Sequence, residues 1–62
     1  MNPDIAELST VSTQIDELVA RITEVAERYR GTDEDAVAVR LFEVERSLMG
    51  ASRSLRSAVR AF

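Results

Sequence analysis

Acidic side chains are the residues of this sequence whose types and spacing come nearest to supporting chemistry. Close pairs occur at three places: Asp16 with Glu17, Glu24 with Glu27, and Glu43 with Glu45. Paired carboxylates can act as general acid and base, or can hold a metal ion inside a helical bundle. Metal-binding bundles of this kind also use a histidine three residues after a glutamate, and this chain contains no histidine. We therefore expect a solvated acidic surface with no catalytic residue, no metal site and no cofactor.

The residue types that are missing narrow the chemistry further. The 62-residue chain has no Cys, and all eight of its basic residues are Arg. Without Cys, His or Lys there is no thiolate nucleophile, no imidazole base and no amine for a Schiff base. The sequence therefore predicts a protein that is not an enzyme and that has no small-molecule substrate.

Composition indicates one small folded domain. Apolar residues make up 45% of the chain, charged residues 31%, and the formal net charge is −3. A domain of this size buries only about 60% of the surface of its unfolded chain. No apolar run is long enough to cross a membrane, and the first residues lack the pattern of a cleaved signal peptide. We therefore expect a cytoplasmic protein with no membrane partner.

The first half of the chain predicts a helix over residues 3–30. Its apolar residues alternate in spacings of three and four, which is the heptad pattern of a coiled coil. They occupy positions a and d: Leu8, Val11, Ile15, Leu18, Ile22, Val25 and Tyr29. Asn2 is suited to cap the start of this helix, with Pro3 at the first helical position, and Gly31 is suited to end it.

The second half predicts another helix over residues 33–61 with the same pattern. Its apolar residues at positions a and d are Val37, Leu41, Val44, Leu48, Ala51, Leu55, Ala58 and Phe62. Thr32 and Asp35 have the spacing of a capping box, which places the helix start directly after a turn at residues 31–32.

So short a turn makes the two helices antiparallel neighbours. The predicted fold class is an all-α, antiparallel two-helix hairpin that resembles a coiled coil and occupies residues 1–62 as a single domain. A pairing in which residue numbers sum to 66 matches a and d positions in every layer, and it places Leu18 opposite Leu48. It also places the basic end of the chain beside acidic residues near the N-terminus.

Apolar residues outside this predicted seam indicate self-association. One side of the hairpin is expected to present Ile5, Val19, Ala26, Ala38, Phe42, Met49 and Val59. A long exposed apolar patch on a small chain is typical of an interface. The simplest closed arrangement is a homodimer with twofold symmetry that forms a four-helix bundle. We expect the double substitution of Phe42 and Met49 by Glu to produce a monomer.

The function that the sequence favours is protein–protein interaction, as a self-associating adaptor or as a regulatory or assembly subunit. A further protein with an acidic surface could bind a group of four arginines: Arg46, Arg53, Arg56 and Arg60. Such a basic stripe can also neutralise phosphates, so a weak nucleic-acid-associated regulator is an alternative, although the negative net charge disfavours nucleic acid. A column of small residues is a second candidate surface: Ser47, Gly50, Ser54, Ser57 and Ala61.

The turn suggests another alternative. Tyr29-Arg30-Gly31 places an aromatic-x-Gly triplet between two antiparallel helices, and Asp33 follows Tyr29 with Tyr-x3-Asp spacing. These residues resemble the Trp-x-Gly turn and the export signal of the small helical-hairpin substrates of type VII secretion. The resemblance implies a small, leaderless hairpin protein that is exported.

Overall fold

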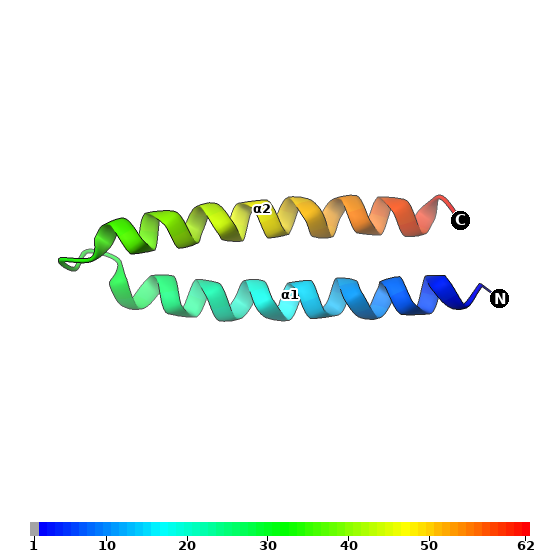
Figure 1. The fold of residues 1–62 in the computed structure, drawn as a ribbon, viewed down its shortest axis with the longest axis horizontal. Coiled ribbons are helices and arrows are strands. Elements are labelled where there is room, and N and C mark those ends of the chain that lie inside the picture. Colours follow the sequence, from blue (N-terminus) through cyan, green and yellow to red (C-terminus); the bar gives the residue numbers. More distant parts are fainter. Residues whose placement is uncertain (1) are drawn as a thin grey trace.

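The chain folds into two helices that pack side by side. A computed structural model describes residues 2–62, in which α1 (Pro3–Tyr29) and α2 (Asp35–Arg60) form an antiparallel hairpin. Figure 1 shows both termini at the same end of the molecule, opposite the turn. The hairpin measures 51 × 15 × 8 Å, so it is a single layer of helices. The predicted all-helical hairpin is confirmed.

Helix α1 begins and ends as the sequence predicts. The Asn2 side chain accepts a hydrogen bond from the Asp4 N–H at 2.9 Å, and Pro3 is the first helical residue. Gly31 follows the helix with a φ of +72°, in the left-handed region that glycine adopts without strain.

The turn is longer than predicted, because α2 starts at Asp35 and not at residue 33. The Thr32 hydroxyl accepts from the Glu34 N–H at 3.1 Å and donates to the Tyr29 carbonyl at 2.6 Å. The Asp35 carboxylate accepts from the Gly31 N–H at 2.7 Å. Thr32 and Asp35 thus stabilise a turn over residues 30–34, and the expected capping box does not form.

The contact between the helices also differs from the predicted seam of positions a and d. The most buried side chains are small and lie at position e of the same heptads: Ser12 (9% exposed), Ala26 (0%), Ala38 (1%) and Ser52 (2%). Three large residues at position d remain exposed instead: Leu18 (44%), Val37 (41%) and Val44 (43%). Small side chains in the seam let the two backbones approach closely, so each helix turns its a and e positions toward the other.

The register is close to the predicted one. Asp16 hydrogen-bonds Ser52, and Thr23 hydrogen-bonds Glu45, across the two helices. In the predicted register Asp16 and Thr23 would lie opposite residues 50 and 43. Each observed partner therefore lies two positions further along α2, which is within the reach of these side chains.

Candidate interaction surfaces

The rotated seam gives the hairpin two broad faces of different chemistry. Because a helix advances about 100° per residue, positions d and b flank the a/e seam on opposite sides. We call the side of position d the apolar face; it comprises Val11, Leu18, Val25, Val37, Val44, Ala51 and Ala58. We call the side of position b the polar face; it comprises Ser9, Asp16, Thr23, Arg30, Phe42, Met49 and Arg56.

The apolar face leaves large hydrophobic side chains in water. Leu18, Val37 and Val44 are all more than two-fifths exposed. A shallow groove also runs between the helices on this side. The groove is lined by Leu18, Arg21, Ile22, Val25 and Leu41. Sequence reasoning assigned the apolar residues among these to the hairpin's own core. The large d side chains could instead have been recognised as outward-facing from the small residues that alternate along position e.

The polar face holds the hydrogen bonds that connect the two helices. The Asp16 carboxylate accepts from the buried Ser52 hydroxyl at 3.0 Å and from the Arg56 guanidinium at 2.8 Å. Nearer the turn, the Thr23 hydroxyl donates to the Glu45 carboxylate at 2.8 Å. No buried side-chain polar atom among residues 2–62 lacks a partner. The buried hydrogen-bonding side chains of this face therefore find their partners within one chain.

The residues predicted for self-association do not form an outer patch together. Ala38 is buried in the seam, and four of the others are half-buried: Ile5, Val19, Phe42 and Val59. Phe42 is also covered by Arg30, whose guanidinium carbon lies 5.0 Å from the ring centre. Met49 is the exposed member of the set, at 43%. The set therefore does not form a continuous exposed patch within one hairpin, because positions e lie mainly between α1 and α2.

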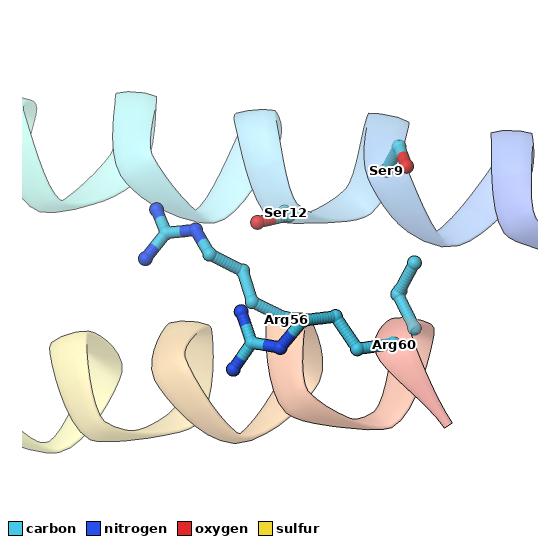
Figure 2. Close-up of a pocket in the computed structure, with 5 residues that line it drawn as sticks. Ser9, Ser12, Arg56 and Arg60 are labelled. Atoms are coloured by element: carbon cyan, nitrogen blue, oxygen red, sulfur yellow. The ribbon is translucent and has the colours of Figure 1, made fainter. Parts of the chain in front are cut away.

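The four arginines predicted to bind a partner lie along the exposed side of α2, but they are not equivalent. Figure 2 shows Arg56 extending from α2 toward α1, beside Ser12, whereas Arg60 lies along its own helix. Arg56 is engaged by Asp16. Within residues 2–62, Arg46, Arg53 and Arg60 form no ion pair. In the small-residue column, Gly50 is half-buried and the others are exposed.

The acidic pairs do not converge on a common site. Glu24 pairs with Arg28 at 3.6 Å on α1, and Glu27 pairs at 3.1 Å with Arg30, which directly follows α1; both pairs are exposed. Across residues 2–62, no three acidic side chains are grouped closely enough to hold a metal ion. In the same part of the chain, neither helix is long and apolar enough to span a membrane.

Comparison of the chain with family models, with curated proteins and with solved structures finds no match. The two faces, their exposure and their charges are therefore the observations on which a function can be argued.

Proposed function

We propose that this chain is a non-catalytic protein–protein interaction module that self-associates through its apolar face. Two hairpins stacked by this face would form a four-helix bundle, which could serve as an adaptor or as a regulatory or assembly subunit. The observation that carries the proposal is the row of exposed large side chains at position d, with Leu18 44% and Val44 43% exposed.

The width of the apolar stripe supports this proposal. Each helix is mainly apolar or small along three adjacent columns, at positions d, a and e, with Glu45 at position e of α2 as an exception. The contact between α1 and α2 uses mainly a and e. Helices that face the core of a bundle bury about three of every seven residues. The unused third column is the one that a second layer of helices would cover.

The dimensions of the hairpin support it independently. The radius of gyration is 14.6 Å, whereas a compact domain of this length has about 11 Å. The accessible surface is 4619 Å², against about 4,000 Å² expected for a compact protein of 6.9 kDa. The excess of about 600 Å² approaches the roughly 800 Å² that each partner buries in a standard interface.

The outer arginines extend the proposal to a further partner. In such a bundle Arg46, Arg53 and Arg60 of each copy would stay on the outside of α2, away from the buried face. They would offer charge-assisted hydrogen bonds to carboxylates of an acidic protein.

The proposal is tested by the solution mass, measured by light scattering behind a sizing column over a range of concentrations. Leu18→Glu places a charge on the apolar face, and Met49→Glu is its matched control, because Met49 is equally exposed but lies on the polar face. We expect the natural chain and Met49→Glu to be dimers, and Leu18→Glu to be a monomer. A natural chain that stays monomeric contradicts the proposal. A dimer that only Met49→Glu dissociates would move the interface to the polar face.

A further inference from the structure

The edge of the apolar face carries an ordered set of polar residues on α1. Glu7, Gln14, Arg21 and Arg28 recur every seven residues, and all four are exposed. Helical geometry places this column, position g, directly beside Val11, Leu18 and Val25, on the side away from α2. These residues would therefore border any partner that covers the apolar face. We call them the α1 rim.

The charges of the α1 rim are complementary to those of a second α1 rim that runs in the opposite direction. Read from the N-terminus, it runs acid, amide, base, base. When a second α1 is laid against it in the opposite direction about a centre near Leu18, Glu7 meets Arg28 of the other copy and Gln14 meets Arg21. Each contact then occurs twice, as twofold symmetry requires. Complementary charges of this kind fix the register and orientation of an interface.

Helix α2 has a matching asymmetry in side-chain size. On the apolar face, its half near the turn carries Val37 and Val44, and its half near the termini carries Ala51 and Ala58. In the observed register residue 50 of α2 lies level with Leu18, so reversal of α2 about the same axis places Val44 beside Ala58 of the other copy and Ala51 beside its own counterpart. Large side chains facing small ones interdigitate, whereas large facing large would hold the layers apart.

We propose that the partner on the apolar face is a second copy of this chain, related to the first by a twofold axis that runs across the helices. The turn of each copy then lies over the open end of the other, an arrangement that we call head-to-tail. This inference rests on the proposed self-association and adds its geometry: α1 stacks on α1, α2 stacks on α2, and the twofold axis passes near Leu18. The opposite orientation, turn over turn, stacks α1 on α2. It brings Arg28 of one copy beside Arg40 of the other, which is repulsive.

Two charge reversals at the α1 rim test this orientation. In the head-to-tail dimer, Glu7→Arg alone brings two positive charges together at each Arg28, and Arg28→Glu alone brings two negative charges together at each Glu7. A heterodimer of the two variants has two attractive contacts. One contact joins the natural Arg28 of one variant to the natural Glu7 of the other. The second contact joins the two substituted residues, whose charges are both reversed and therefore still opposite. We expect each variant alone to dimerise about tenfold more weakly than the natural chain, and the mixture to form heterodimers preferentially. Native mass spectrometry of the mixture, with one variant isotope-labelled, measures this preference.

Arg46→Glu is the matched control, because it makes the same charge change as Arg28→Glu on the outer side of α2. It should dimerise like the natural chain and show no preference for either variant. Circular dichroism of each variant alone confirms that it remains helical, and recovery of association in the mixture shows that each variant is folded. The contrary result is a strengthened Arg28→Glu homodimer. The turn-over-turn orientation requires that result, because the introduced carboxylate would then face Arg40 of the other copy.

A single cysteine provides a second measurement, since the chain has none of its own. Leu18→Cys lies beside the proposed axis and should form an intermolecular disulfide under mild oxidation, whereas Val11→Cys should not. Equal disulfide yields at both positions overturn the head-to-tail orientation while leaving self-association intact. A natural chain that is monomeric at every concentration refutes self-association itself.

Discussion

The contact of Asp16 with Ser52 and Arg56 should be a main support of the hairpin, and its removal leads to a quantitative prediction. Ser52 is only 2% exposed, and its hydroxyl donates to Asp16 at 3.0 Å. Asp16→Ala leaves this buried hydroxyl without its acceptor, which costs about 1–3 kcal/mol. The ion pair with Arg56 adds less than about 1 kcal/mol, because both side chains are half-exposed.

A gain in helix propensity of roughly 0.5 kcal/mol offsets part of this loss, because Ala is the better helix former. We therefore expect Asp16→Ala to lower the free energy of unfolding by about 2 kcal/mol, and the melting temperature by roughly 10 °C. In a chain that already carries Ser52→Ala, the same substitution removes only the exposed ion pair. It should then change the stability by less than about 0.5 kcal/mol.

The assay is a double-mutant cycle by urea unfolding, followed by circular dichroism at a concentration where all four proteins have the same oligomeric mass. The expected coupling energy between Asp16 and Ser52 is about 1–2 kcal/mol. A coupling below about 0.3 kcal/mol, within the error of additivity, refutes the reasoning. It would mean that the Ser52 hydroxyl turns to the Leu48 carbonyl one helical turn earlier, as serine can in a helix.

Two further predictions concern positions where a side chain would be enlarged. Ala38→Leu should lower the free energy of unfolding by about 1–3 kcal/mol, because the seam between the helices has no room for the larger side chain. Ala20 is exposed, so Ala20→Leu should change this free energy by no more than about 0.5 kcal/mol. Equal melting temperatures for the two variants would contradict the small-residue seam. Gly31→Ala should destabilise by about 1–2 kcal/mol through its φ of +72° alone, while Gly50→Ala should stabilise by up to about 1 kcal/mol, since its added methyl meets only the Arg53 guanidinium at 3.8 Å. Chemical denaturation measures both, and the same sign for the two glycines would be the opposing result.

The helices and their order could be predicted from the sequence because those signals are local. The cap at Asn2, the left-handed Gly31 and the apolar spacing each act within a few residues, and the cap, the glycine and the two helices are confirmed in the structure. The register was also nearly correct, because it follows from the position of the turn. These features together determine an antiparallel hairpin whichever columns meet between the helices.

The seam could not be chosen from the same pattern. Positions a and d recur with spacings of three and four, and so do positions a and e. The pattern favours the pair with larger apolar residues, which placed Leu18 and Val44 inside. In the structure the seam consists of positions a and e instead. Ala26 and Ala38 are buried there, and the Asp16–Ser52 hydrogen bond joins the helices beside them. Each helix is thus turned about its own axis relative to the prediction, so position d is exposed where position e was expected to be.

The single-layer hairpin has a consequence for how the chain folds. Its cross-helix contacts join residues of steadily increasing separation, from 22 positions for Thr23–Glu45 to 40 for Asp16–Arg56. The entropy lost on closing a loop grows with the logarithm of its length, so the outer contact costs about 0.5 kcal/mol more if it forms first. We expect the transition state for folding to be organised around the turn, and substitutions near Thr23 to slow folding while those near the termini mainly speed unfolding. Stopped-flow kinetics of paired variants would show this order.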